Sequence, residues 1–325
     1  MSIEDALGQR VRGQSHAVAA VARTLSIASA GLTPPERPLS VLLLTGPTGV
    51  GKTSMVQAVA STLRGRPDDF CRIDMSALAQ EHYAASFSGA PPGYAGSKEG
   101  HSLFDRDRID GNPMQAGIVL FDEVEKAHPV VLRALLGLLD SGMLRLSAGT
   151  GSIDFRNCHV FMTSNLGSRA LLEQANRRWR PRWRTQRSPV AAAVKSFFEP
   201  EFLNRIDEVI EFVPLTPAVA AEIIDIEIGR VAAALARRGI DLTVSGEARH
   251  ALVDTGFDRE FGARALHRTV RTKLLGPLAS ATSKASDAPR PQAIAVDLTA
   301  GGALVCRRSE EVSAKEAKTR NSVCA

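Results

Sequence analysis

An eight-residue motif, GPTGVGKT at residues 46–53, limits the possible folds more than any other part of the chain. It follows a continuous apolar run, LSVLLLTG, which predicts a buried parallel strand, and it precedes a helix expected from about Thr53 to Leu63. A glycine-rich loop between a buried strand and a helix is typical of a phosphate-binding loop. The alternative, a glycine-rich turn with a surface lysine, would not require this order of elements.

The residues of this loop have separate expected roles in binding ATP and Mg²⁺. Its three glycines let backbone N–H groups turn toward phosphate oxygens. Lys52 would reach the β- and γ-phosphates, and Thr53 would be a ligand of Mg²⁺. The nucleotide-binding residues expected in the loop are Gly46, Pro47, Thr48, Gly49, Val50, Gly51, Lys52 and Thr53.

Two further apolar runs end in polar residues that suit ATP hydrolysis. IVLFDE, residues 118–123, predicts a strand with two carboxylates at its carboxyl end, where ligands bind in open α/β sheets. Asp122 would complete the Mg²⁺ shell, and Glu123 would orient and polarise the attacking water. FMTSN, residues 161–165, ends in Asn165, which could position the water or the γ-phosphate. Taken alone, either run could also be a strand that ends in a solvated turn.

The order of predicted elements indicates two domains. Strand candidates FCRID, GIVLFD and HVFMTS alternate with helical stretches over residues 1–214, which predicts an α/β fold with a parallel sheet flanked by helices. A helix is expected over residues 15–31, with Ser15 as its N-cap. Residues 215–306 predict a small, mostly helical domain with two short strands, AIAVDL and ALVC. Residues 307–325 are charged and poor in apolar side chains, so we expect disorder there.

The positive charge of the chain comes from one segment. RRWRPRWRTQR, residues 177–187, holds six arginines and both tryptophans, and without those arginines the net charge of +5 would be −1. The segment could be a patch for nucleic acid, an acidic partner or a membrane surface, or a solvated insertion. We see no signal peptide and no apolar run near the roughly 20 residues that span a bilayer. With four scattered cysteines, these features predict a cytoplasmic protein without a membrane association.

Several motifs together resemble one protein family. The chain is similar to the second ATPase module of the ClpB-type Clp chaperones, in the AAA+ superfamily, over roughly residues 10–300. The motifs that carry the resemblance are GPTGVGKT, GAPPGYAG, FDEVEKAHP, IDFRN, MTSNLGS, FFEPEFLNRIDEVIEFVPL and FDREFGARAL. The resemblance implies an AAA+ phosphate-binding-loop fold, a C-terminal lid domain, and an ATPase that depends on Mg²⁺, with ATP between the two domains.

The resemblance also implies roles for individual residues. Val11 in RVRGQ would line the adenine pocket. Arg205 in FLNRID resembles the arginine finger, which acts on the nucleotide of a neighbouring subunit, so hydrolysis would require a homo-oligomeric ring, expected to be a hexamer. Arg264 in FGARAL resembles the sensor in the lid domain that touches the γ-phosphate. We therefore expect Glu123, Asn165 and Arg205 to be catalytic, and Arg264 to bind nucleotide.

The GAPPGYAG segment resembles the loop that faces the axial channel of such a ring. Gly93, Tyr94, Ala95 and Gly96 would form it, and Tyr94 would grip an extended protein substrate, since an aromatic ring packs on any sequence. The alternative is a turn whose tyrosine packs locally. Ser97 stands where the family has a second aromatic residue, and the segments 104–117 and 142–154 are longer than the family pattern.

These observations predict a single-ring AAA+ chaperone that hydrolyses ATP, remodels or unfolds proteins, and threads a polypeptide through an axial pore. The chain has no IGF- or IGL-like tripeptide, so we do not expect a ClpP-type protease as a partner. Two alternatives stay open. One is an NTPase that depends on nucleic acid and binds it through residues 177–187. The other is a nucleotide-dependent scaffold. We favour the chaperone, and so do not expect nucleic acid as a partner.

Overall fold

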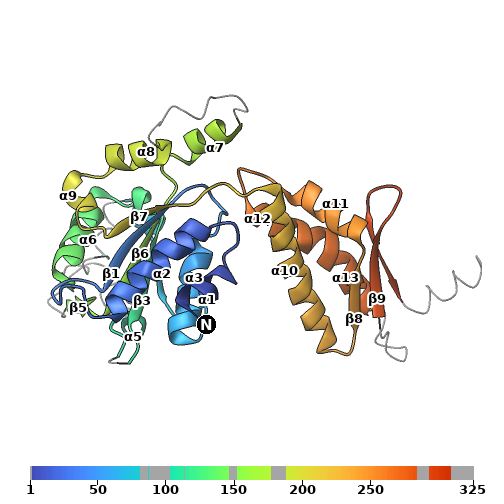
Figure 1. Ribbon diagram of the computed structural model, residues 1–325, viewed down its shortest axis with the longest axis horizontal. Coiled ribbons are helices and arrows are strands. Elements are labelled where there is room, and N and C mark those ends of the chain that lie inside the picture. Colours follow the sequence, from blue (N-terminus) through green and yellow to red (C-terminus); the bar gives the residue numbers. More distant parts are fainter. Residues whose placement is uncertain are drawn as a thin grey trace, which may run out of the picture. The chain divides into compact units, whose positions relative to one another are not determined.

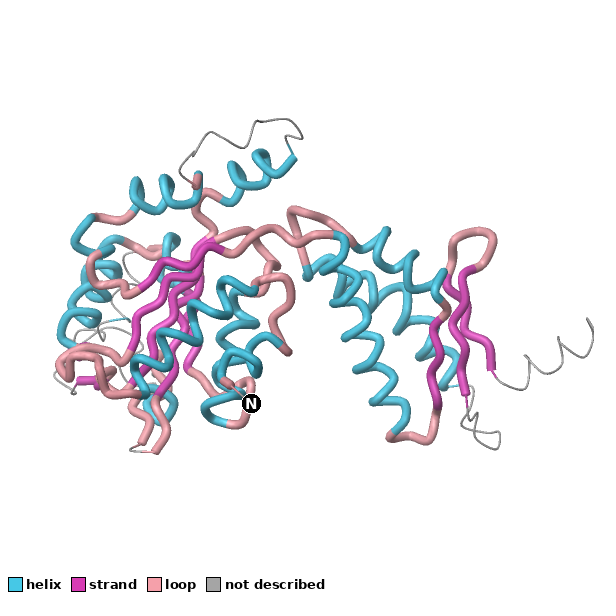
Figure 2. Tube along the Cα trace, viewed as in Figure 1, coloured by secondary structure: helices cyan, strands magenta, loops and turns pink. Residues whose placement is uncertain are grey.

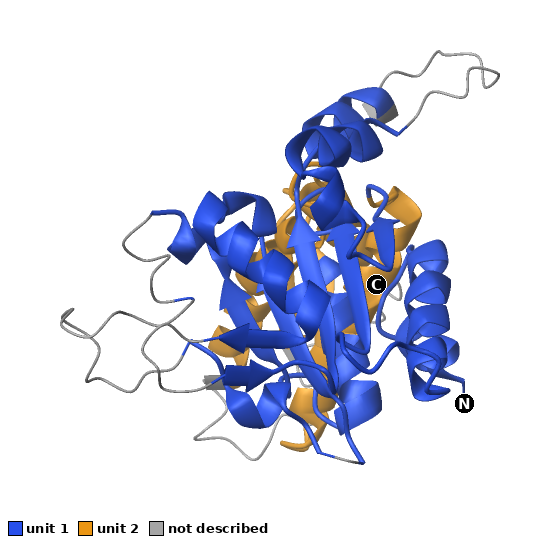
Figure 3. Cartoon of the chain, turned by 90° about the vertical axis from the view of Figure 1, so that its left-hand side faces the viewer, with its two compact units in different colours: residues 1–214 blue, residues 215–325 orange. Residues whose placement is uncertain are grey.

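The structure is a computed structural model that describes residues 2–80, 87, 103–112, 114–145, 152–176, 188–283 and 293–308. The chain forms two compact units, residues 1–214 and residues 215–325, which Figure 3 colours separately. The expected channel loop, residues 93–96, and the basic segment, residues 177–187, lie outside the described residues. None of the described helices combines the length and apolar character needed to span a membrane.

Helices and strands alternate along the first unit, as Figures 1 and 2 show. The described helices are α1 (Ile3–Gly8), α2 (Ser15–Ser29), α3 (Lys52–Arg64), α5 (Arg106–Ile109), α6 (Pro129–Ser141), α7 (Ser168–Asn176), α8 (Pro189–Phe197) and α9 (Pro200–Leu203), with 3-10 turns η1 (Met75–Leu78) and η2 (Val124–Lys126). The strands are β1 (Ser40–Thr45), β2 (Cys71–Asp74), β3 (Gly117–Asp122), β4 (Met143–Arg145), β5 (Ser152–Asp154), β6 (Cys158–Ser164) and β7 (Glu208–Glu211).

A parallel sheet forms the centre of the first unit. Among the described residues its strand order is β2-β3-β6-β1-β7, and each neighbouring pair is parallel. The predicted α/β fold with a parallel sheet is confirmed, and the four predicted strands form β1, β2, β3 and β6. The sequence analysis did not predict β7, because this strand lies at the edge of the sheet and its EVIE sequence buries only Ile210.

Helices cover both faces of this sheet, as expected for parallel strands. Alternate side chains of β1 enter different cores: Leu42 and Leu44 pack with α1, α2 and α3 on one face. Val41 and Leu43 pack with α6, α8 and α9 on the other. The central strands β1, β3 and β6 are therefore buried along their whole length, which explains why apolar runs predicted them correctly.

The beginning of α2 differs from the prediction by one residue. Gln14, not Ser15, is the N-cap, and its side chain makes no capping hydrogen bond. Instead the buried Gln14 amide donates to the carbonyls of Val50 and Val213, and its oxygen accepts from the Val213 N–H. Gln14 therefore joins the phosphate-binding loop to Val213, which lies 199 positions after Gln14 in the chain.

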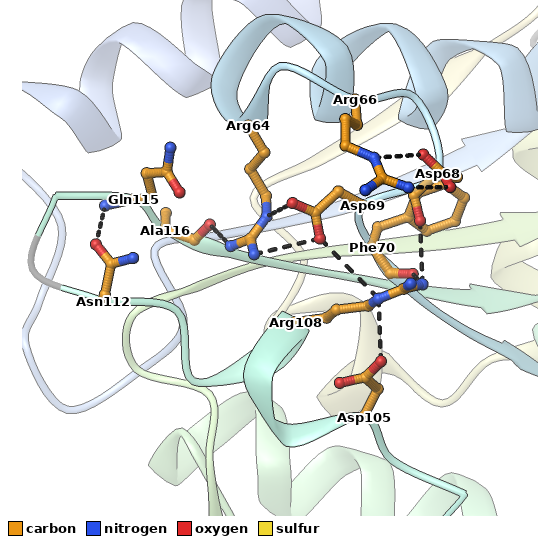
Figure 4. A network of polar contacts seen from close by, with 10 residues as sticks. All are labelled: Arg64, Arg66, Asp68, Asp69, Phe70, Asp105, Arg108, Asn112, Gln115 and Ala116. Atoms are coloured by element: carbon orange, nitrogen blue, oxygen red, sulfur yellow. Dashed lines mark hydrogen bonds and ion pairs between the residues drawn. The ribbon is translucent and has the colours of Figure 1, made fainter.

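A polar network holds α5 against the sheet, and Figure 4 shows its members. Arg64, at the end of α3, contacts Asp69 at 2.9 Å and donates to the carbonyl of Ala116, just before β3. Arg108 of α5 pairs with Asp105 at 3.0 Å and donates to the carbonyl of Phe70. The network therefore fixes α5, within the segment 104–117, to the amino ends of β2 and β3.

The second unit is mostly helical and also holds a small sheet. Its described elements are α10 (Pro217–Ala236), β8 (Asp241–Val244), α11 (Gly246–Gly256), α12 (Ala263–Thr269), the π-helical segment η3 (Val270–Leu275), α13 (Gly276–Ser283), β9 (Ala293–Leu298) and β10 (Leu304–Arg308). The three strands have the order β10-β9-β8 and cover a core that includes Leu252 and Leu266.

Two expectations for this unit need correction. A third strand, β8, was not predicted, because its half-exposed DLTV sequence follows a helix closely and pairs with β9 from a distant part of the chain. Arg307 and Arg308 were predicted to begin a disordered tail, but they belong to β10. They pair with Ala295 and Ile294 of β9, so the backbone ladder extends the strand beyond its apolar residues.

A buried histidine predicts how stability depends on pH. His159 in β6 lies within 2.8 Å of the Ser40 hydroxyl, and burial lowers its pKa from 6.5 to about 4, because the charged imidazolium loses its hydration. Between these values the unfolded chain binds more protons than the folded chain. The free energy of unfolding should therefore fall as the pH drops from 6.5 toward 4, by roughly 1.4 kcal/mol per unit and by about 3 kcal/mol in total.

Urea unfolding at several pH values between 7 and 4, on the wild type and His159→Gln, measures this contribution. The variant should show a weaker loss of stability in this range than the wild type. His250→Gln, at an exposed position, should retain the wild-type slope. Equal slopes for His159→Gln and the wild type would contradict the assignment.

Candidate functional site

Three loops meet at the carboxyl edge of the sheet, because their strands are neighbours. The strand β6 lies between β1 and β3, with Thr45 opposite Ser164 and Phe121 opposite Met162. Each strand leads into a predicted site segment: β1 into the phosphate-binding loop, β3 into Asp122 and Glu123, and β6 into Asn165. The parallel topology thus gathers residues that are far apart in sequence, where ligands bind in open α/β sheets.

The phosphate-binding loop depends on glycine at defined positions. Gly46, Gly49 and Gly51 have φ angles of 132°, 74° and 108°, which residues other than glycine rarely adopt. A Cβ atom on Gly46 would lie 2.5 Å from the Phe212 carbonyl oxygen, so even alanine would not fit there. The loop ends at Lys52, the first residue of α3, and places the amino end of that helix at the site.

The buried Lys52 ammonium lies at the centre of the loop. Its Nζ atom donates to the carbonyls of Gly46 at 2.5 Å and Pro47 at 2.8 Å, and to the Asn165 Oδ1 atom at 2.8 Å. Asn165 in turn donates from Nδ2 to the Glu123 Oε1 atom at 3.2 Å. Because an ammonium only donates and a carboxylate only accepts, these two partners determine the orientation of the amide.

Asn165 therefore connects the predicted phosphate-binding lysine to the predicted water-activating glutamate. Glu123 itself has φ 58° and ψ 52°, and among the described residues it is the one non-glycine residue with a positive φ. A left-handed conformation is unfavourable for a side chain with a Cβ atom, and such residues often occur at functional sites. The Thr163 hydroxyl stabilises this turn by accepting the Glu123 N–H at 2.9 Å.

Asp122 is buried and has two charged or polar partners. Thr163 donates its hydroxyl proton to Oδ1, and Arg72 of β2 donates to Oδ2, with the Nε atom at 3.1 Å. Thr163 therefore contacts both members of the acidic pair. Neither partner was predicted, although Thr163 is a hydroxyl residue inside the apolar part of FMTSN and so carried a recognisable signal.

Two further side chains support the site and were also missed. Glu125 accepts the backbone N–H of Asn165 at 3.0 Å and thereby holds the residue that bridges Lys52 and Glu123. The buried Gln14 amide contacts the loop at Val50, as described above. Val11, the expected adenine-pocket residue, is buried beside this loop, 3.7 Å from the position of a Cβ atom on Gly51.

These residues fit ATP and Mg²⁺ by the chemistry of their donor set. A buried ammonium and a loop with several positive φ angles suit an anion of high charge. Among the described residues, no group of three or more His, Cys, Asp or Glu side chains could hold a metal ion. Mg²⁺ bound with a nucleotide does not need such a group, because phosphates and water supply most ligands. Asp122 and Thr53 would be its protein ligands.

The remaining predicted residues belong to other segments of the chain. Arg205 follows α9 and belongs to the first unit, where its Nε atom forms an ion pair with the Asp140 Oδ1 atom at 2.8 Å. Arg264 is the second residue of α12 in the second unit. The roles of both arginines stay predictions, as do the roles of residues 93–96.

The sequence matches two known domain families. Residues 37–209 match the AAA domain (Cdc48 subfamily), and residues 215–295 match the C-terminal, D2-small domain of ClpB protein. The first match covers more than half of the chain and includes the lysine, the acidic pair and Asn165. The phosphate-binding loop and its supporting residues are therefore those of an AAA+ ATPase.

Similar proteins indicate the branch of this family. The chain is 53% identical to the "ATP-dependent protease ATP-binding subunit-like protein" of Rhodococcus erythropolis, over 86% of this chain and 82% of the relative. It is 44% identical to the similarly named protein AmiB of Pseudomonas aeruginosa, over 86% and 78%. It is 43% identical to "Chaperone protein ClpB" of Aquifex aeolicus, over 86% of this chain but only 28% of that relative. The chain belongs to the Clp family of AAA+ ATPases and corresponds to the C-terminal ATPase module of ClpB.

The geometry predicts different defects for two substitutions. Lys52→Ala should abolish ATP binding, since it removes the buried cation from the loop. Glu123→Gln should preserve ATP affinity and stop turnover, because the amide retains the Asn165 contact through its oxygen but cannot polarise water. Isothermal titration and steady-state turnover measure the two effects separately. Equal loss of affinity in both variants would contradict the assigned roles.

Proposed function

We propose that this ATPase forms a single homo-oligomeric ring, a hexamer, and uses ATP hydrolysis to remodel or unfold protein substrates. The chemistry within one chain would follow from the contacts at the sheet edge. Lys52 and the glycine-rich loop would bind the phosphates, and Glu123 would polarise the attacking water while Asn165 holds its carboxylate in place. Bound Mg²⁺ would neutralise charge on the phosphates, with Asp122 and Thr53 as its protein ligands.

The position of Arg205 is the observation that supports the ring. Arg37 donates to the Arg205 carbonyl, and the nearby Asp207 bonds to Val41 near the start of β1. The phosphate-binding loop follows the opposite end of that strand. The length of β1 alone separates the two ends by about 16 Å, since a strand rises about 3.3 Å per residue. An arginine side chain does not span that distance, so Arg205 suits the nucleotide of an adjacent subunit.

Arg205→Ala should therefore impair turnover without loss of ATP affinity. A guanidinium that stabilises the transition state from another subunit contributes about 10³–10⁵ in rate, so we expect turnover to fall by roughly 10³. Asp140→Asn is the matched control, because it removes the ion pair of Arg205 but retains the arginine; its turnover should stay near the wild-type value.

Light scattering of Glu123→Gln with ATP should give the mass of six 34.7 kDa chains. A monomer with full turnover would contradict the ring.

The proposed unfolding of protein substrates by the ring depends on Tyr94. This tyrosine stands between Gly93 and Gly96 in a segment that resembles the channel loop of the Clp family. An aromatic ring can pack against many different substrate sequences, and neighbouring glycines allow the loop to move with the nucleotide cycle. The relatives named ClpB carry the name "Chaperone protein", and this name supports the proposed unfolding activity for this module. The role of Arg264 as a γ-phosphate sensor belongs to the same proposal.

Tyr94→Ala should preserve thermal stability and basal ATP hydrolysis but abolish unfolding of a tagged fluorescent protein. Tyr94→Phe should retain much of the unfolding rate, because the aromatic contact and not the hydroxyl supplies the grip. If Tyr94 packs locally instead, Tyr94→Ala should lower stability and ATPase together. Unfolding at the normal rate by Tyr94→Ala would rule out the threading role.

Stimulation of the ATPase separates this proposal from the nucleic-acid alternative. Casein, an unfolded protein, should stimulate turnover, whereas DNA and RNA should not. Stimulation by nucleic acid alone, lost when the six arginines of residues 177–187 are replaced by serine, would favour the alternative.

A further inference from the structure

One arginine outside the known site contacts the backbone of the proposed arginine finger. Arg37 precedes β1, and its side chain is about three-quarters buried, with 25% exposed. Its Nη2 atom donates to the Arg205 carbonyl at 2.7 Å and lies 3.1 Å from the Asp207 Oδ1 atom. One guanidinium therefore bridges the main chain of Arg205 and the side chain of Asp207, although 168 residues separate Arg37 and Arg205.

Asp207 continues this connection into the sheet. Its Oδ2 atom accepts the Val41 N–H at 2.7 Å, and its own N–H donates to the Val41 carbonyl at 2.9 Å. Both carboxylate oxygens of Asp207 are thus used, one by Arg37 and one by the first residues of β1. The strand is buried and paired on both sides, so it provides a rigid support for residues 205–207.

The backbone of Arg205 has few other restraints. The residue follows a helix of four residues, its N–H bonds to the Phe202 carbonyl, and its side chain is 37% exposed beside the more exposed Asp140. A surface ion pair of this kind contributes little to holding a side chain. The contacts of Arg37 are less exposed, and a hydrogen bond from a charged donor is stronger than a neutral one.

We propose that Arg37 is a positioning residue for ATP hydrolysis on the neighbouring subunit. It fixes the main chain of Arg205 relative to β1, so that the guanidinium is presented at a defined place on the surface of the subunit. This inference rests on the proposed role of Arg205. A displacement of about 1 Å of a catalytic group can reduce a rate about 10²-fold, so loss of this contact should be visible in turnover.

The first test is a set of single variants of the full chain. Arg37→Ala should lower kcat about tenfold or more, with KM for ATP and the thermal unfolding midpoint close to the wild-type values. Arg37→Lys should recover part of kcat, since an ammonium can still donate to the Arg205 carbonyl or to Asp207 but does not bridge them as well. Arg23→Ala is the matched control, because Arg23 makes a similar ion pair, 2.7 Å, with the adjacent residue Glu208. It should retain the wild-type kcat.

Mixed rings test which subunit depends on Arg37. A Lys52→Ala subunit cannot bind ATP but keeps its Arg205, whereas an Arg205→Ala subunit binds ATP but has no finger. Their mixture should regain turnover that neither variant has alone. Arg37→Ala added to the Lys52→Ala partner should lower the regained turnover about tenfold or more, and Arg37→Ala added to the Arg205→Ala partner should leave it nearly unchanged. Arg23→Ala in either partner should have no effect.

The outcomes separate the inference from the function on which it rests. Wild-type turnover of Arg205→Ala, or no regained turnover in the reference mixture, would overturn the proposed function and this inference with it. Normal function of Arg205 with wild-type kcat in Arg37→Ala would overturn the inference alone. Equal loss from Arg37→Ala in both mixed-ring arrangements would show a general effect on the fold and would also overturn it.

Discussion

The backbone pairing of β6 with β1 on one side and β3 on the other is the constraint on which the site depends. It brings the phosphate-binding loop, the acidic pair and Asn165 to one edge. It also turns Thr163 toward Asp122 and the Glu123 N–H. A shift of one residue in this register would move Thr163 to the other face of the sheet, since side chains alternate along a strand. The contacts within the site therefore depend on register as much as on residue identity.

The sequence was most informative where a local pattern has one structural meaning. A buried apolar run followed by GPTGVGKT predicted β1, its loop and α3, and the end of IVLFDE predicted the position of Asp122 and Glu123. The strands β7 and β8 were missed because each is short and half-exposed, and each depends on a partner from a distant part of the chain. Arg307 and Arg308 were misjudged for the same reason, since pairing with β9 outweighs their charge.

Composition and spacing do not reveal which side chains support the predicted residues. Arg72, Glu125 and Gln14 are ordinary polar residues in the sequence, and each acquires a role only when the sheet brings distant segments together. Gln14 shows the difficulty clearly: a helix-start pattern favoured Ser15 as the cap, whereas the buried amide of Gln14 bonds to two other loops. Thr163 was more accessible to prediction, because a buried hydroxyl in an apolar strand requires a hydrogen-bonding partner.

The two ends of β1 carry different parts of the proposed reaction. Its carboxyl end leads to the loop that would bind the chain's own nucleotide, and its amino end holds Asp207 and, with Arg37, the segment of Arg205. Because β1 is buried and paired along its length, neither end can shift much without the other. In a ring, each subunit would thus present an arginine whose position is tied to its own phosphate-binding loop. This arrangement would let the state of one nucleotide site influence hydrolysis at the next without any additional element.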